Sequence, residues 1–162
     1  MNPMSTTSPD TSLPKEIDRI LKCNWYDNTS GIWACYPKDG FTWRPRNIIL
    51  LNALPLNAFL GPTRLDVYPV STDALLNTLA NLNLPMNYKC YIGHRPTIDI
   101  ITKYLGPINC TRGMYAYTPD TDLIVAFVLR SRPNSSGVDV NVDVSDLLTY
   151  VIIPSLLYTS YS

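Results

Sequence analysis

The residues able to do chemistry are few and scattered, beginning with His94, the single imidazole in the 162-residue chain. It lies in the tetrapeptide Gly93-His94-Arg95-Pro96. Catalysis by a histidine needs a nucleophile and an orienting acid. The sequence contains neither a Gly-x-Ser-x-Gly motif nor a Cys–His signature that would supply them. Because Pro96 is typical of a first helical position, the sequence predicts that His94 caps the helix that follows.

Two pairs of carboxylates have a spacing suited to acid–base work or to binding a divalent ion: Asp120 with Asp122, and Asp139 with Asp143. The second pair alternates with valines, a pattern typical of the solvated face of a strand. The seven glycines are isolated, so no phosphate-binding loop is present. The sequence therefore predicts no catalytic residue, metal site, cofactor or small-molecule substrate, and hence a protein that is not an enzyme.

The cysteines are four in number and far apart: Cys23, Cys35, Cys90 and Cys110. Zinc sites need closely spaced ligands, so this spacing argues against one. Residues 1–15 are rich in Ser, Thr and Pro and lack the apolar segment of a signal peptide. We therefore expect free thiols in a reducing compartment and a protein that is not secreted. No apolar run in the sequence approaches the roughly 20 residues that a membrane-spanning helix needs.

The formal net charge is +0, because thirteen Lys and Arg balance thirteen Asp and Glu. The charges are unevenly distributed along the chain. Residues 38–112 carry eight cations and four anions, whereas residues 120–146 carry two cations and five anions. Opposite patches on one domain can drive head-to-tail self-association; alternatively, folding intermixes the charges. Charged residues make up only 16% of the chain, which also favours association.

The basic middle of the chain is the segment expected to contact an anionic partner. Its candidate contact residues are Lys38, Arg44, Arg46, Arg64, Lys89 and Arg95. The densest basic and aromatic point is Trp43-Arg44-Pro45-Arg46. Two interpretations of it stay open: the arginines bind a phosphate or lipid head group, or they pack on tryptophan. No RNA-stacking motif of the RRM or OB type is present, so direct RNA recognition is not indicated.

The elements that must position these residues are short, because 14 prolines divide the chain. The spacing of apolar residues predicts helices over residues 15–23, 72–82 and 96–105, the second capped by Ser71 or Thr72. Strands are expected at residues 46–54, 63–70, 86–92, 114–117, 122–130 and 138–144, with a hairpin within residues 25–43. Residues 132–137 form a turn sequence, so the last two strands are expected to pair as a hairpin.

The helices and strands alternate without a repeating βαβ rhythm. This pattern favours the α+β class, with a mainly antiparallel sheet packed against two or three short helices. Residues 1–14 have low hydrophobicity and are expected to form a flexible tail. Residues 15–162 are expected to form a single globular domain.

Residues 91–106, Tyr-Ile-Gly-His-Arg-Pro-Thr-Ile-Asp-Ile-Ile-Thr-Lys-Tyr-Leu-Gly, resemble the core of rhabdovirus matrix proteins. In that family a helix is followed by a Tyr-Ile-Gly strand, an Arg-Pro step, a second helix and a closing Leu-Gly. The similarity covers roughly residues 63–132, and the chain length looks like that of the short matrix proteins of plant rhabdoviruses. The resemblance implies a non-enzymatic viral matrix protein found in the virion and host cytoplasm, peripheral to membrane.

Such a protein would self-associate, condense the viral nucleoprotein–RNA core and link it to the inner face of the envelope. The basic residues named above would then contact the nucleoprotein or an acidic membrane surface. By analogy with the family's segment-into-pocket contacts, the residues implied in self-association are Leu13, Pro14, Ile17, Ile20 and Leu21. The alternative is a viral accessory protein, such as a movement protein or silencing suppressor, that binds a host protein or RNA.

Overall fold

The computed structural model describes residues 13–23, 25–27, 29–30, 32–34, 43–82, 87–119, 121–130 and 142–156. Residues 1–12 of the predicted tail (residues 1–14), together with Cys35, Lys38, Asp120 and the stretch 131–141, lie outside the described residues. The elements follow one another in this order: α1 (Lys15–Lys22), β1 (Trp25–Asp27), β2 (Ile32–Ala34), β3 (Trp43–Pro45), β4 (Asn47–Leu51), η1 (Leu56–Ala58), β5 (Thr63–Val70), α2 (Thr72–Ala80), β6 (Asn87–Cys90), α3 (Arg95–Leu105), β7 (Asp122–Leu129), η2 (Val144–Asp146) and β8 (Leu147–Leu156).

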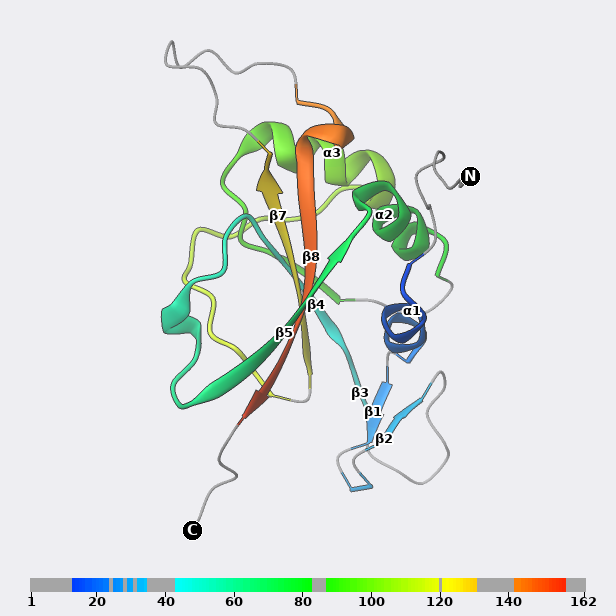
Figure 1. Cartoon of the computed structure of the whole chain (residues 1–162), viewed down its shortest axis with the longest axis vertical. Helices are drawn as coiled ribbons and strands as arrows, with labels where there is room; N and C mark the ends of the chain where they lie inside the picture. The colour runs from blue at the N-terminus through cyan, green and yellow to red at the C-terminus, as the bar shows by residue number, and fades with distance from the viewer. Residues whose placement is uncertain are drawn as a thin grey trace, which may run out of the picture.

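The main sheet has five strands in the order β5-β8-β7-β4-β6 (Figure 1). β4 pairs in parallel with both β6 and β7. β8 pairs antiparallel with β7 on one side and with β5 on the other. A separate three-stranded antiparallel sheet, β2-β1-β3, contains the hairpin that the sequence predicted near residues 25–43.

The α+β class and the three helices are confirmed, but the main sheet is mixed rather than mainly antiparallel. The prediction assumed that parallel pairing would need a regular βαβ repeat. Parallel strands need only a long crossover between them. Here α2 lies within the chain segment that joins β4 to β6, and α3 lies within the segment that joins β6 to β7. These crossovers allow three parallel neighbours without a repeating pattern.

Local signals explain the boundaries of α2 and α3. The Ser71 side chain accepts a hydrogen bond from the backbone N–H of Ala74 at 3.2 Å, which caps α2 as the sequence predicted. Pro96 stands in the first turn of α3, where its missing N–H costs nothing. Gly106 ends α3 with φ of 83°, a left-handed conformation that only glycine adopts readily.

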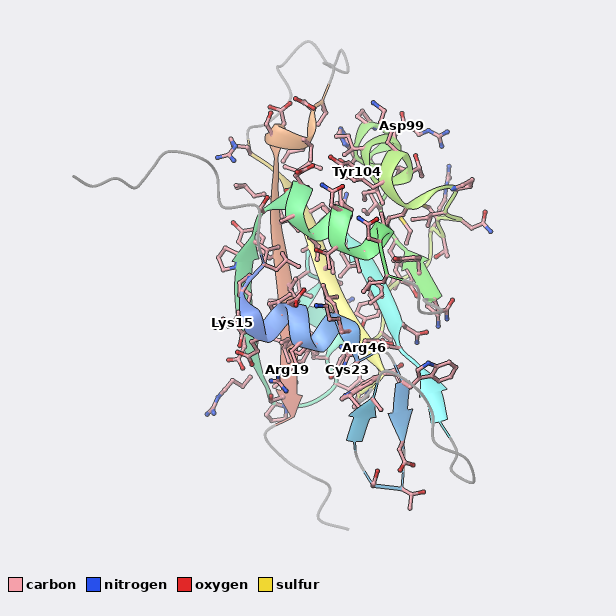
Figure 2. All side chains as sticks on the ribbon, turned by 90° about the vertical axis from the view of Figure 1, so that its right-hand side faces the viewer. Lys15, Arg19, Cys23, Arg46, Asp99 and Tyr104 are labelled. Atoms are coloured by element: carbon pink, nitrogen blue, oxygen red, sulfur yellow. The ribbon has the colours of Figure 1, made fainter. Side chains whose placement is uncertain are left out.

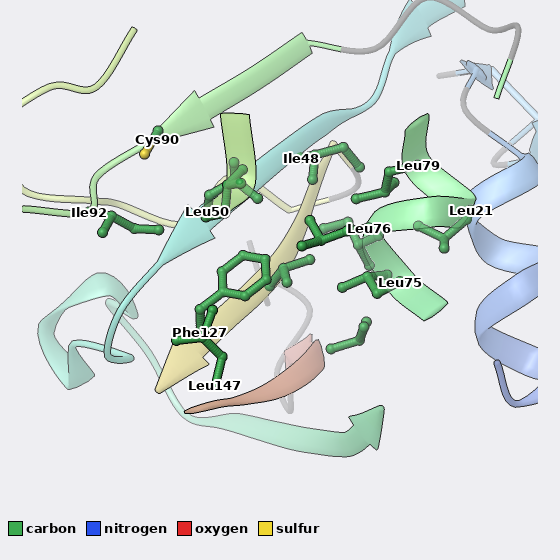
Figure 3. Close-up of a cluster of buried hydrophobic side chains, with 14 of the residues drawn as sticks. Leu21, Ile48, Leu50, Leu75, Leu76, Leu79, Cys90, Ile92, Phe127 and Leu147 are labelled. Atoms are coloured by element: carbon green, nitrogen blue, oxygen red, sulfur yellow. The ribbon is translucent and has the colours of Figure 1, made fainter. Parts of the chain in front are cut away.

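The larger hydrophobic core lies between the sheet and the three helices. Alternate residues of the central strands point into it, among them Ile48 and Leu50 of β4 and Phe127 of β7 (Figure 3). Leu75 and Leu76 of α2 are fully buried against them. Amphipathic helices as short as these are marginal alone, so packing on the sheet is what stabilises them.

The opposite face of the sheet holds a smaller core, covered by Ala58 of η1 and by Tyr115 and Tyr117 of the irregular segment 106–119. Ile49, Leu51 and Ile124 point to this side and are buried there with Tyr115. The strand predicted at residues 114–117 is absent, since that stretch is irregular. Its residues bury the sheet face without forming a ladder of their own.

β7 does not have the predicted partner. It is paired on both sides, by β4 and by β8, and the strand that follows it in the antiparallel pair is β8 instead of residues 138–144, of which residues 138–141 lie outside the described residues. Val144 belongs to η2, where Asp143 caps the turn through a reciprocal pair of hydrogen bonds with Asp146. Residues 147–156 are more apolar than the alternating valine and aspartate stretch, and a central position in the sheet favours them.

Candidate functional site

The outer edge of β5 is the part of the main sheet left open to pairing. β5 ends the strand order, and no strand pairs with its outer side within the residues that the structure describes. At the opposite end of the sheet, Cys110 bridges onto the outer side of β6 at Cys90. An unpaired edge presents backbone N–H and C=O groups that can pair with a strand from another chain.

Pro69 indicates which backbone groups face this open edge. Its nitrogen carries no hydrogen and cannot donate to β8, and proline within a sheet is found where its nitrogen faces outward. Along a strand, alternate residues present their N–H and C=O groups to the same side. We therefore infer that Thr63, Leu65 and Val67 point their backbone groups outward.

The side chains of β5 alternate between the two faces of the sheet. Leu65 packs against the smaller core, whereas Tyr68 packs against the core beneath the helices. Arg64 and Asp66 share the face of Tyr68 and are both exposed. Val67 is 51% exposed, unusual for a large apolar side chain in a strand. The strand thus combines an open backbone edge, an exposed valine and two exposed charges of opposite sign.

The start of α1 lies beside this edge. The Tyr68 hydroxyl donates a hydrogen bond to a carboxylate oxygen of Glu16 at 2.9 Å. The pKa of the Tyr68 hydroxyl is raised, mainly because this hydrogen bond to Glu16 stabilises the protonated form. Figure 2 shows Lys15 at the end of α1 that lies near β5 and Cys23 at the other end.

The structure also locates the five residues implied in self-association. Ile17 and Leu21 are fully buried in the chain's own core, and Leu13 and Ile20 are partly buried against it. Pro14 is exposed and precedes the first turn of α1. A neighbouring copy would therefore meet the outer face of α1, not Ile17 or Leu21. A role of this segment in assembly stays a prediction.

The predicted contact cations are not gathered into one patch. Arg64 is exposed on β5 at one end of the strand order, and Lys89 is exposed on β6 at the other end. Arg95 is exposed at the start of α3 and forms an ion pair with Asp99 at 3.4 Å. Arg44 belongs to β3 in the small sheet. The structure therefore offers no shared basic surface built from these described residues.

Arg46 is inside the protein, with only 7% of its surface exposed. Its guanidinium carbon lies 3.6 Å from the centre of the Trp33 ring, and Nη1 donates to the backbone oxygen of Ile20 at 3.2 Å. Burial lowers the pKa of Arg46 to about 10. Of the two interpretations of residues 43–46, packing on tryptophan therefore holds for Arg46, and the ring comes from β2. Arg46 joins β2, α1 and the start of β4 (Figure 2).

Three large apolar side chains are exposed in segments that lie on the side of the main sheet opposite the helices. Leu56 is 81% exposed, Leu60 is 99% exposed and Met114 is 76% exposed. The two segments that carry these residues are held together, because the N–H of Tyr117 donates to the oxygen of Ala58 at 3.0 Å. Two residues separate Leu60 from Thr63, the first residue of β5, so Leu60 lies close to the start of that strand.

The groups first considered for chemistry have structural partners. His94 occupies the N-cap position of α3 as predicted, but its side chain makes no capping hydrogen bond to the helix backbone; its Nδ1 lies 2.8 Å from the Thr97 hydroxyl instead. The Asp122 carboxylate accepts hydrogen bonds from Asn47 and from the buried Tyr115, which fastens segment 106–119 to the sheet. Within the described ranges, no three His, Cys, Asp or Glu side chains are grouped so as to hold a metal ion. None of the described helices is long and apolar enough to cross a membrane.

In the part of the chain that the structure describes, the fold and site define an α+β domain with a mixed five-stranded sheet, helices on one face and an open edge at β5. No protein-family model and no curated protein sequence matches the chain. Among solved structures, the chain is similar to B116 of Sulfolobus turreted icosahedral virus, at 15% identity and a TM-score of 0.48. That comparison covers 65% of this chain and 97% of the other.

These comparisons correct the resemblance to rhabdovirus matrix proteins, which is wrong. The rhabdovirus matrix family is not matched by the chain, and the structural similarity found is to a different protein. The resemblance depended on a short motif around α3. That motif, with Pro96 in the first turn and Gly106 at the end, is common at the two ends of short helices in unrelated proteins.

Sequence reasoning missed Leu65, Asp66 and Val67 as candidate site residues and included Arg64 for a different reason. The strand itself was predicted with the correct bounds. What marks the site is the order of residue types in Thr63-Arg64-Leu65-Asp66-Val67, where opposite charges flank a central leucine. This signal is visible in the sequence, but it has meaning only once β5 is known to be an edge strand.

Proposed function

We propose that the chain is a non-enzymatic structural protein that self-associates through the outer edge of β5. The observation that carries the proposal is the open edge of this eight-residue strand together with its self-complementary sequence. Strand addition at an open edge makes main-chain hydrogen bonds that give affinity, while the side chains of the paired strands give specificity. Two copies joined in this way would share one continuous sheet.

Self-complementarity is centred on Leu65. If two copies of β5 pair antiparallel about a two-fold axis at Leu65, Arg64 of each copy lies directly opposite Asp66 of the other. Leu65 and Val67 would then exchange backbone hydrogen bonds with Leu65 and Thr63 of the second copy. The charged residues occupy the intervening positions, where opposed Cα atoms are only about 4.5 Å apart. Opposite charges at such positions stabilise strand pairing.

The charges also select this register over its neighbours. Moving the axis by one residue, to Arg64 or to Asp66, would place like charges directly opposite each other, which is unfavourable. Charged residues and proline commonly protect edge strands from pairing. Here Pro69 lies outside the five central residues, and the two charges have opposite signs. The edge therefore repels a misaligned copy and attracts a correctly aligned one.

Three further features favour a second copy of this chain as the occupant. The net charge of +0 removes long-range repulsion between copies. Pairing would cover part of Val67, which is now 51% exposed. It would also place the start of each α1 near the shared edge, because Glu16 contacts Tyr68 of β5. Of the five residues predicted for self-association, Leu13 and Pro14, which precede this end of α1, would thus lie nearest the interface.

The proposal is limited to self-association. Condensation of a nucleoprotein–RNA core and attachment to an envelope were implied only by the rhabdovirus resemblance, which no longer supports them. The predicted basic contact residues supply no common surface that would favour either role.

The test is a charge-swap cycle on the full chain. Arg64→Asp and Asp66→Arg each place like charges opposite one another in both symmetric pairs. Each substitution is therefore expected to weaken the dimer, which raises its dissociation constant about tenfold at low salt. The double variant Arg64→Asp/Asp66→Arg restores opposite charges and is expected to return to within about threefold of the wild type. Sedimentation velocity over a concentration series measures the dissociation constants.

Lys89→Asp is the matched control, because Lys89 is an exposed cation on the far edge strand. It is expected to leave the dissociation constant unchanged. The proposal fails if the double variant associates no better than the two single variants. It also fails if the wild type stays monomeric at every concentration, an outcome that would favour the accessory-protein alternative.

A further inference from the structure

Two thiols meet at the edge of the sheet opposite β5. Cys90 is the last residue of β6 and is only 2% exposed, while Cys110 lies in the segment after α3 and is half-buried. Their Sγ atoms are 2.7 Å apart. Both residues are thiols in the structure. Figure 3 shows the Cys90 side chain at the border of the larger core, at the end of β6.

The backbone around the two cysteines is already arranged for a covalent bond. Cys90 and Cys110 form a parallel β-bridge, and the N–H of Thr111 donates to the oxygen of Cys90 at 2.9 Å. Bridged residues on neighbouring strands have Cα atoms about 4.8 Å apart. Disulfides span Cα separations of about 4.4–6.8 Å. Bond formation therefore requires no rearrangement of the main chain.

We propose that Cys90 and Cys110 form a reversible intramolecular disulfide that fastens the segment after α3 to the outer side of β6. The oxidant is a small-molecule disulfide such as oxidised glutathione. In a reducing compartment both residues stay thiols, as the sequence led us to expect. The disulfide therefore forms only when the concentration of such an oxidant rises. The proposal is independent of the assembly proposed for β5.

The two cysteines have different parts in the exchange. Cys110 is the more exposed, so its thiolate attacks one sulfur of the small disulfide, whose S–S bond breaks and releases one thiol. The Cys90 thiol then loses its proton to solvent, and its sulfur attacks the Cys110 sulfur of the mixed disulfide. This second step expels the second small thiol, which takes up a proton. Two electrons pass from the cysteines to the oxidant.

Burial limits the second step. It raises the pKa of Cys90 to about 12, so this thiol is rarely ionised at neutral pH. We therefore expect the mixed disulfide at Cys110 to form first and to close faster as the pH rises. The 2.7 Å separation of the two sulfur atoms favours closure once Cys90 loses its proton.

The disulfide would attach the segment after α3 covalently to the outer edge of β6. The bridge from Cys110 already occupies the outer side of β6 at Cys90. Covalent closure would hold the start of the segment that covers the smaller core, which continues to Tyr115 and Tyr117. Oxidation would thus stiffen the far edge and leave the edge at β5 open.

The experiment oxidises the full chain with oxidised glutathione, blocks the remaining thiols and digests the protein with trypsin without reduction. Trypsin cleaves after Lys89, Lys103 and Arg112, whereas the Arg95–Pro96 bond resists it. The expected product is peptide 90–103 linked to peptide 104–112, with a mass lower by two hydrogen atoms than the sum of the peptides. The melting temperature of the oxidised protein should rise by about 6–12 °C.

Cys110→Ser and, separately, Cys90→Ala should remove both the linked pair and the rise in melting temperature. Cys23→Ser is the matched control and should preserve both. The proposal is overturned if oxidation stops at glutathione on Cys110, if the linked peptides contain Cys23 or Cys35, or if all four thiols still react with the blocking reagent.

Discussion

Replacing Val67 with proline is expected to weaken self-association at least about a hundredfold while leaving the fold of the monomer intact. In the proposed dimer the Val67 N–H donates to the oxygen of Thr63 of the second copy, and symmetry repeats this bond. Proline removes both donors and places a ring at the interface. Leaving the opposed carbonyls without partners adds to the loss.

The monomer should tolerate the change because the Val67 N–H points away from β8. Proline is accepted in edge strands where its nitrogen faces outward, and the preceding residue, Asp66, is already extended. The matched control is Val67→Thr, which keeps the N–H and the β-branched shape. Sedimentation velocity gives the dissociation constants, and thermal unfolding followed by circular dichroism checks the fold. A large drop in the melting temperature of Val67→Pro would show that this N–H donates to β8 after all.

Leu21→Ala is expected to lower the free energy of unfolding by about 3 kcal/mol, the usual cost of removing a fully buried leucine. Leu21 is 0% exposed and packs in the core with α2 and the sheet. The resemblance to rhabdovirus matrix proteins implied a different role for Leu21, namely that it inserts into a pocket of a neighbouring copy. The two roles differ in what the substitution changes: a core residue affects the stability of the monomer, and an anchor affects association.

Urea unfolding in the Val67→Pro background measures the monomer alone, because dissociation then makes no contribution. Leu60→Ala is the matched control, since Leu60 is 99% exposed and should change the free energy of unfolding by less than about 0.5 kcal/mol. An unchanged stability for Leu21→Ala, together with weaker association in the otherwise wild-type chain, would contradict the core role.

The elements predicted well are those determined by neighbouring residues. β5 begins and ends as expected, because Pro62 precedes it and the Ser71 cap of α2 follows. α1 and α3 lie within about a residue of their predicted bounds for similar local reasons. Capping residues, prolines and glycines act within one turn, so the sequence contains the whole signal.

The order of the strands could not be predicted in the same way. No strand was predicted at β8, and β7 was assigned a partner only because a turn sequence follows it. Which strand pairs with β7 depends on burial on both faces of the sheet, and that is decided by residues far away in the chain, such as Ile48 and Val151. The edge position of β5, and with it the candidate site, depends on this order.

Burial of single residues was also beyond the sequence. For Arg46 the sequence left two interpretations open, contact with an anionic partner or packing on tryptophan, and could not decide between them. Arg46 is buried because Trp33 and the end of α1 meet above the start of β4, a contact between segments that the sequence does not link. The close approach of Cys90 and Cys110 is of the same kind, since it depends on how the chain returns after α3.

The most direct test of self-association through β5 is amide hydrogen exchange followed residue by residue at low and high protein concentration. The amides of Leu65 and Val67 face the open edge and should exchange rapidly in dilute protein and slowly in concentrated protein. Those of Arg64 and Asp66 face β8 and should be protected at both concentrations, which provides an internal control. If Leu65 and Val67 exchange at the same rate at every concentration, the edge of β5 is not the interface.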